Sequence, residues 1–175
     1  PYYQPYAPGT PTARRLPPLT NPNFGDELSA AVVSGAWYSG GWSNADGRVG
    51  EPGWTNGTGP TCGDPAAVST AVFPNCPDKL FQFHHQPFNY YANFAPGTHA
   101  RAVHLRDEQE FIAAAESGDL KRVSFVKPIG AENEHPGYAS EHSGSSHLVD
   151  LLQAIENGPD ADSTLDVAGL SVISG

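Results

Sequence analysis

The sequence predicts an α/β domain whose sheet is largely parallel. Three observations indicate this class: a capped helix pattern between Asp107 and Gly118, a β-rich run at residues 122–128, and an apolar stripe over about residues 145–157 that is typical of a second helix. Helices and strands that alternate along a chain usually form α/β folds with parallel sheets. The length of 175 residues suits one domain.

The sequence predicts an extended arm at the start of the chain, followed by the domain. Residues 1–22 are rich in Pro and Tyr, show no apolar period and contain the breakers Pro17-Pro18 and Asn21-Pro22. Residues 23–175 are expected to form the α/β domain. Within it, residues 42–77 are mostly Gly, Pro, Asn, Thr and Asp, so they predict a long loop. Loops of this length in compact domains are often functional.

A short helix and a strand are expected between the arm and this loop. Asp26 is of a residue type that caps helix N-termini, so we expect it to begin the helix. Gly35 should end the helix, and residues 36–38 should then form a short strand.

The two later helices carry clear start and stop signals. Asp107 and Glu110 have the spacing of a capping box, with Asp in place of Ser or Thr, and Gly118 suits the position after the last turn. The second helix should stop at Gly158-Pro159. Its apolar stripe consists of Leu148, Leu151, Leu152 and Ile155.

Charge and hydropathy exclude two classes of partner. The formal net charge is −10, and an acidic chain repels the phosphate backbone, so no nucleic acid partner is expected. No apolar run approaches the roughly 18 residues of a membrane span, so no transmembrane segment is predicted. The chain opens on no signal-peptide pattern, and we expect any secretion signal to have been removed or left out.

Cys62 and Cys76 predict a disulfide. Closing a loop of about 15 residues could stabilise the fold by roughly 3 kcal/mol. Two free buried thiols are the alternative, whereas a zinc site is a poor fit to two cysteines without Cys-x-x-Cys spacing. With the glycosylation sequon at Asn56, the pair favours a protein made in an oxidising compartment, either secreted or periplasmic.

The histidines are the most informative candidates for chemistry. His84 and His85 lie in the aromatic segment 81–91, where neighbouring side chains of an extended chain point to opposite faces. The alternative is a core histidine beside a surface one. Glu134 and His135 follow the β-rich run, and ligands bind beyond the carboxyl ends of parallel strands. His135 could donate to an anionic oxygen and Glu134 could orient it, unless this is a solvated Pro-Gly turn.

The remaining residues supply no standard catalytic motif. His99 and His104 are expected at the surface, and His142 and His147, which flank the start of the last helix, are expected to be surface or capping residues rather than ligands. The sequence contains no Gly-x-Ser-x-Gly elbow, no phosphate-binding Gly-x-x-x-x-Gly-Lys loop and no His-Glu-x-x-His helix. From the residues alone, the sequence supports a histidine-lined anion pocket and nothing more specific.

Several sequence motifs occur in a fixed order, and together they resemble those of a known protein family. They read WYSGGW from Trp37 to Trp42, FQFHHQPFNYY from Phe81, HLRDE from His104, VSFVKP from Val123 and NEHPGY from Asn133. The series resembles the bacterial phosphoesterase family that contains phospholipases C and acid phosphatases. The likeness runs over about residues 25–164.

The resemblance implies both a fold and an activity. The fold would be a three-layer α/β/α sandwich of alkaline-phosphatase type, present here as an incomplete portion with long loops. The activity would be metal-dependent hydrolysis of phosphate esters by an exported enzyme. His85 and His135 match the catalytic histidines of the family, and His84 and Glu134 match phosphate-binding positions.

The chain also departs from the family pattern. The resemblance implies a Glu-Asn metal motif and a Ser or Thr nucleophile that would precede Pro1, and a Tyr-Asp-Glu segment where residues 163–173 lack a paired acid. We therefore expect part of an enzyme that is inactive in isolation. A divalent metal ion would bind only in the complete enzyme, and a companion chain could complete the fold. The alternative is a non-catalytic secreted binding protein on the same scaffold.

Overall fold

The structure is a computed structural model that describes residues 4–6, 12–55, 81, 85–134 and 139–165. Four candidate residues of the sequence lie outside these ranges, so the disulfide and two of the four pocket residues stay predictions. They are Cys62, Cys76, His84 and His135.

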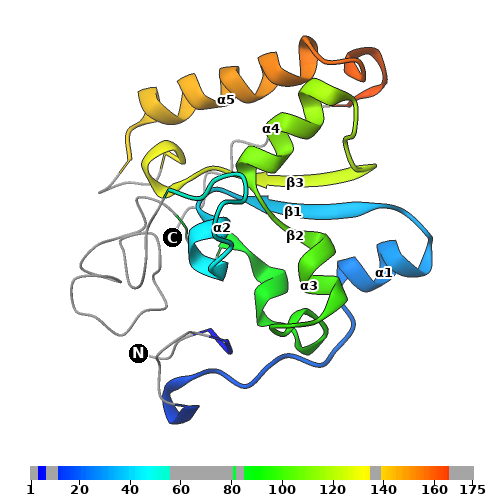
Figure 1. The fold of residues 1–175 in the computed structure, drawn as a ribbon, viewed down its shortest axis with the longest axis vertical. Coiled ribbons are helices and arrows are strands. Elements are labelled where there is room, and N and C mark those ends of the chain that lie inside the picture. Colours follow the sequence, from blue (N-terminus) through cyan, green and yellow to red (C-terminus); the bar gives the residue numbers. More distant parts are fainter. Residues whose placement is uncertain (1–3, 7–11, 56–80, 82–84, 135–138, 166–175) are drawn as a thin grey trace.

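A parallel three-stranded sheet forms the centre of the fold (Figure 1). Its strands are β1 (Gly35–Ser39), β2 (Leu105–Asp107) and β3 (Val123–Lys127), in the order β2-β1-β3. The register pairs the last residue of β1, Ser39, with Asp107 on one side and Lys127 on the other. The carboxyl ends of all three strands therefore lie together at one edge, and the predicted α/β class is confirmed.

Two helices cover one face of this sheet (Figure 1). They are α4 (Glu108–Ser117) and α5 (Glu141–Glu156). Alternate residues of a strand point to the same face, and this alternation sends two side chains of β1 toward the helices. The buried cluster on this side consists of Ala36, Tyr38, Phe111, Ala115, Leu151 and Ile155.

The opposite face is covered by shorter and more irregular elements. They are α1 (Phe24–Ala30), α2 (Trp42–Asp46), α3 (His99–His104), η3 (Pro87–Tyr90) and η4 (Ala92–Phe94). The buried cluster here is mainly aromatic and consists of Trp42, Phe81, Phe88, Phe94 and Leu105. Helices therefore lie on both faces of the sheet, as the predicted three-layer arrangement requires (Figure 1). Three further short 3-10 helices are η1 (Thr12–Arg14), η5 (Gly130–Glu132) and η6 (Ala161–Ser163).

The predicted start and stop signals are partly confirmed. Asp107 and Glu110 form the expected capping box, and Gly118 adopts the left-handed conformation after α4. α5 begins at Glu141 rather than near residue 145, because the Ser140 side chain caps it. At the first helix the prediction of Asp26 as N-cap is wrong.

Asn23 caps α1 instead, and Asp26 occupies the third helical position of a capping box. The Asn23 side chain accepts from the Asp26 backbone N–H, and the Asp26 carboxylate accepts from the Asn23 backbone N–H at 2.8 Å. α1 ends at Ala30, so Gly35 does not end the helix but begins β1. Residues 42–46, expected at the start of the long loop, form α2.

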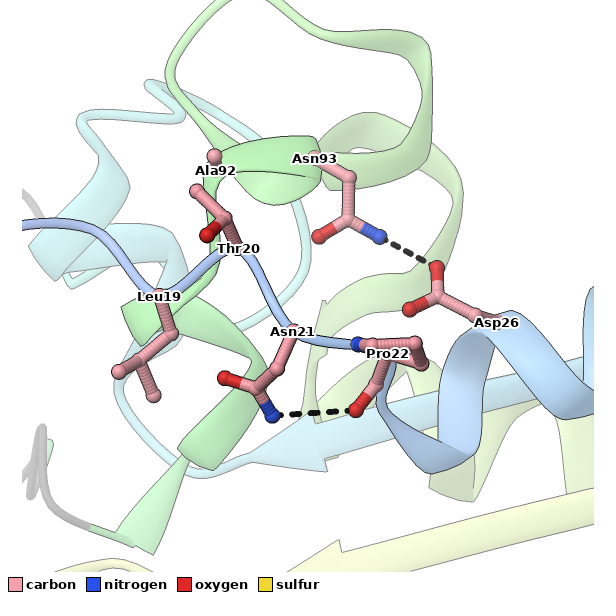
Figure 2. A pocket seen from close by; sticks show the side chains of 7 residues that line it. All are labelled: Leu19, Thr20, Asn21, Pro22, Asp26, Ala92 and Asn93. Carbon is pink, nitrogen blue, oxygen red and sulfur yellow. Dashed lines mark hydrogen bonds between the residues drawn. The ribbon is translucent and has the colours of Figure 1, made fainter.

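The described parts of the arm lie against the body of the fold. Leu19 forms a parallel bridge with Tyr91, and the Tyr6 hydroxyl donates to the Tyr91 carbonyl at 3.1 Å. A hollow of about 330 Å³ lies between the arm, α1 and η4 (Figure 2). Figure 2 shows Asn93 donating to Asp26 across this hollow, at 2.8 Å. The Asp26 carboxylate is thereby satisfied, and the hollow is a seam rather than a charged site.

Truncation of Leu151 should destabilise the fold. Leu151 is 7% exposed in the cluster between α4 and α5, and Leu148, one turn earlier, is 36% exposed. Leu151→Ala should lower the free energy of unfolding by about 2–5 kcal/mol, because the cavity forms in a packed core. Chemical denaturation measures this loss, with Leu148→Ala as the control. Equal losses in the two variants would contradict the burial of the stripe.

Candidate active site

The carboxyl edge of the sheet gathers a group of acids and one histidine, here called the carboxyl-edge cluster. One member ends β2, the next begins α4, two lie in the turn after β3, and one comes from α5. In parallel α/β sheets, ligands bind beyond this edge. The members of the cluster are Asp107, Glu108, Glu132, Glu134 and His147.

Asp107 fastens the loop after β1 to the end of β2. It is 1% exposed, and its carboxylate accepts from the backbone N–H groups of Ser43 at 2.9 Å and Gln109 at 3.1 Å. Burial raises the pKa of the Asp107 carboxyl, and these two hydrogen bonds oppose that shift. Both carboxylate oxygens hold protein donors, so Asp107 organises the site rather than contacting a ligand.

Glu108 is the most unusual charge in the cluster because only 2% of it is exposed. Its Oε1 lies 2.8 Å from Nε2 of His147. Gly40 makes room on the other side, since a Cβ there would lie 3.1 Å from Glu108 Oε2 and would collide with Ile129. Burial raises the pKa of the Glu108 carboxyl, while the hydrogen bond from His147 lowers it. A buried carboxylate needs such a partner to remain charged.

His147 joins Glu108 to the turn after β3. Its second nitrogen, Nδ1, lies 3.2 Å from Oε2 of Glu132. Both ring nitrogens therefore face carboxylates, an arrangement that suits the imidazolium because only that form has two N–H donors. The hydrogen bond to Glu108 raises the pKa of His147, against its burial, and the charges of Glu108, Glu132 and Asp150 add to this rise.

Glu134 is held by the beginning of α5. Its backbone has a φ of 64°, which is rare for a residue with a side chain. The Ser145 hydroxyl donates to Glu134 Oε1 at 2.9 Å. Gly144 leaves space for the Glu134 side chain, which a Cβ at that position would strike. The predicted pocket residue Glu134 thus lies beyond the carboxyl end of β3, as expected.

The other described histidines differ in how far they are buried. His85 is half-buried and directly precedes Gln86, which is fully buried. Its predicted convergence with His135 is untested, since His135 lies outside the described residues. His99 and His142 are exposed, as predicted.

Two histidines that were expected at the surface are not there. His104 is half-buried, with Nδ1 2.7 Å from the Gly35 carbonyl oxygen, because α3 packs beside the amino end of β1. The His147 side chain is only 12% exposed. A sequence signal for His147 existed: it lies one helical turn before Leu151, on the side of α5 that carries the buried stripe.

The described residues do not fit a metal ion. Within the ranges that the structure describes, no group of three or more His, Cys, Asp or Glu side chains is placed to hold one. The same part of the chain contains no helix long and apolar enough to cross a membrane.

Three arginines surround a second hollow, of about 620 Å³, beside α2 and α3. Asp46 contacts Arg48 and Arg101, each at 2.8 Å, and Glu110 contacts Arg106 at 3.2 Å. All three guanidinium groups are therefore already paired with carboxylates. This hollow is consequently a weaker candidate for an anion site than the carboxyl edge of the sheet.

Substitution of Gly144 should be harmful although it lies in a helix. Alanine normally stabilises a helix by about 1 kcal/mol relative to glycine. Here the new Cβ would strike Glu134, so Gly144→Ala should instead destabilise by about 1–3 kcal/mol. Urea unfolding measures the effect. The same change should cost less in a Glu134→Gly background, where the obstructing side chain is gone, and an undiminished cost there would refute this explanation.

The pairing of His147 should make stability fall as pH rises above about 6.5. The pKa of His147 is raised in the folded protein, so its stabilisation is complete below the unfolded pKa of about 6.5 and is lost as pH rises through the folded pKa. His147→Gln should flatten this part of the profile of unfolding free energy against pH. His142→Gln changes an exposed histidine on the same helix and should leave the slope as it is. An identical slope in the His147 variant would contradict the pairing.

Comparison of the sequence with known proteins identifies the family to which the chain belongs. A search of curated proteins finds no match to this chain. The model of the phosphoesterase family, however, matches residues 7–167, nearly the whole chain. This match extends over the motifs on which the resemblance rests, and over every residue of the carboxyl-edge cluster. The chain therefore belongs to the phosphoesterase family.

Proposed function

We propose that this chain forms part of a metal-dependent hydrolase of phosphate esters, of the acid phosphatase or phospholipase C type. Membership of the phosphoesterase family carries the proposal, because it implies phosphate ester substrates. The position of the carboxyl-edge cluster supports it, since titratable groups gather where an α/β fold binds ligands.

The charge of the cluster supports a requirement for a metal ion. The cluster holds four acids and a single imidazole, which contacts two of them, so a phosphate ester would approach an excess of negative charge. A divalent cation would offset this charge and polarise the phosphoryl oxygens. Because the described residues do not fit such an ion, we propose that the complete enzyme holds it through other residues.

The proposed chemistry of this chain lies in its histidines. His85 and His135 would donate hydrogen bonds to the phosphoryl oxygens, and one of them would protonate the leaving oxygen. His84 would add a contact to the phosphate. Glu134, which is fixed by Ser145, would orient the neighbouring imidazole rather than touch the anion.

Replacement of either catalytic histidine should reduce turnover. In the complete enzyme, His85→Ala or His135→Ala should lower kcat for an aryl phosphate by roughly 10²–10⁴, the usual contribution of a general acid or base. Release of the phenolate product with added divalent metal measures it. His142→Ala is the matched control, and unchanged kcat in both site variants would remove the proposed roles.

The isolated chain of 175 residues should not turn over phosphate esters at an enzymatic rate. The motivation is that a family-like nucleophile and paired metal acids are not found among its motifs. Robust hydrolysis of the aryl phosphate by the pure chain with divalent metal would contradict this. Specific binding without turnover by the complete protein would favour the non-catalytic alternative.

We also propose that the protein is exported and that Cys62 and Cys76 form a disulfide. The short loop between them and the sequon at Asn56 support an oxidising compartment. Thiol labelling of the native protein without reductant should find no reactive cysteine. Two reactive thiols would exclude the bond.

A further inference from the structure

The turn after β3 is attached to α5 at two separate points. Nearer the strand, Glu132 contacts Nδ1 of His147 at 3.2 Å. At the far end, Glu134 accepts from Ser145 at 2.9 Å and packs on Gly144. Within the described residues, the Glu132 N–H donates to the Ile129 carbonyl at 3.0 Å. The two side-chain attachments to α5 hold Glu134 beside that helix.

His147 also connects this turn to a second strand end. Its Nε2 contacts Glu108, which directly follows β2 and is 2% exposed. One imidazole thus joins α5, the beginning of α4 and the turn after β3. Glu108 is almost fully buried, and Gly40 lies against its other carboxylate oxygen.

Both contacts depend on the charge of His147. A neutral imidazole has one N–H donor, so after loss of the proton one ring nitrogen would face its carboxylate with a lone pair instead of an N–H group. The acids that face the ring come from three elements: Glu108 from α4, Glu132 from η5 and Asp150 from α5 itself. Of the two contacts, that with Glu132 should open first, because the Glu132 side chain is 40% exposed and can be solvated.

We propose that His147 is a positioning residue of the phosphoesterase site, which as an imidazolium holds the turn at residues 130–134, and with it Glu134, against α5 and Glu108. The effect of His147 on catalysis rests on the proposed function, because the turn leads in sequence directly into His135. The structural part of the proposal does not depend on that function. Loss of the proton would release the turn without unfolding the core.

Nuclear magnetic resonance of the chain tests the charge state. The pKa of His147 should lie above the ordinary value of about 6.5, and both ring nitrogens should be protonated below it. Glu132→Gln retains an acceptor but removes a charge, and it should lower the pKa of His147. A pKa of His147 at or below about 6.5 in the wild-type chain would overturn the proposal.

Hydrogen exchange tests whether His147 keeps the turn at residues 130–134 in place. In His147→Gln the amide of Glu132 should exchange about tenfold faster than in the wild type, because the ion pair between His147 and Glu132 is lost. Amides in the middle of α4 should be unaffected, which distinguishes a local release from global unfolding. His142→Gln should leave the Glu132 amide unchanged. Equal protection of this amide in wild type and His147→Gln would overturn the proposal.

Kinetics of the complete enzyme test the consequence. His147→Gln should lower kcat for an aryl phosphate and remove the alkaline fall of its pH profile, whereas His142→Gln should do neither. An unchanged pH profile in an active His147→Gln enzyme would overturn the positioning role. A wild-type enzyme without phosphatase activity would contradict the proposed function instead, and titration and exchange would still decide whether His147 holds the turn.

Discussion

The parallel register of three short strands is the constraint on which the rest of the structure depends. β1 is hydrogen-bonded on both sides, so Ser39 has Asp107 and Lys127 as neighbours at the carboxyl edge. Whatever follows each strand must then meet at that edge. The backbone continues this alignment by one residue, because the Gly40 N–H donates to the Lys127 carbonyl at 2.9 Å. Only a glycine allows the chain at residue 40 to pass so close to Ile129.

Burying the carboxylates of the carboxyl-edge cluster is unfavourable in free energy, and this indicates that the cluster has a role beyond stability. Asp107 and Glu108 are almost fully buried, and a buried carboxylate is unfavourable unless donors surround it. Backbone amides satisfy Asp107, and His147 satisfies Glu108. Replacing a buried ion pair such as Glu108–His147 by apolar residues of similar size is often neutral for stability. Stability alone therefore does not account for the buried Glu108, whereas the positioning of a polar turn does.

The sequence predicted those elements whose signals are local. The capping box at Asp107, the strand at residues 123–127 and the apolar stripe of α5 depend on neighbours within one or two turns. The first two are present, and the stripe is buried at Leu151 and Ile155 but exposed at Leu148. β2 was missed because its three residues are too few to show an alternating pattern. α2 was missed because its Trp-Ser-Asn-Ala-Asp sequence carries little helix propensity and is stabilised by packing.

The same reasoning explains the prediction of the site. Glu134 was expected beyond the carboxyl end of β3 because that strand is recognisable in the sequence, and its role in the site stays a prediction. The roles of Glu108 and His147 depend on a contact between residues 39 positions apart, which no local pattern contains. His147 was interpreted from its place near a helix start, whereas its environment is decided by β2, the strand that the sequence did not reveal.

The arginines beside α2 and α3 take part in the same electrostatic arrangement. Glu110 accepts from the Asp107 backbone N–H at 2.9 Å, and its carboxylate also lies 3.9 Å from Arg48 and 3.2 Å from Arg106. The negative charge of Glu110 raises the pKa of Asp107, and the positive charge of Arg48 lowers it. Pairing Glu110 with arginine thus reduces the repulsion among acids at the carboxyl edge. The arginines therefore stabilise the acidic site from outside, and their hollow needs no phosphate to explain it.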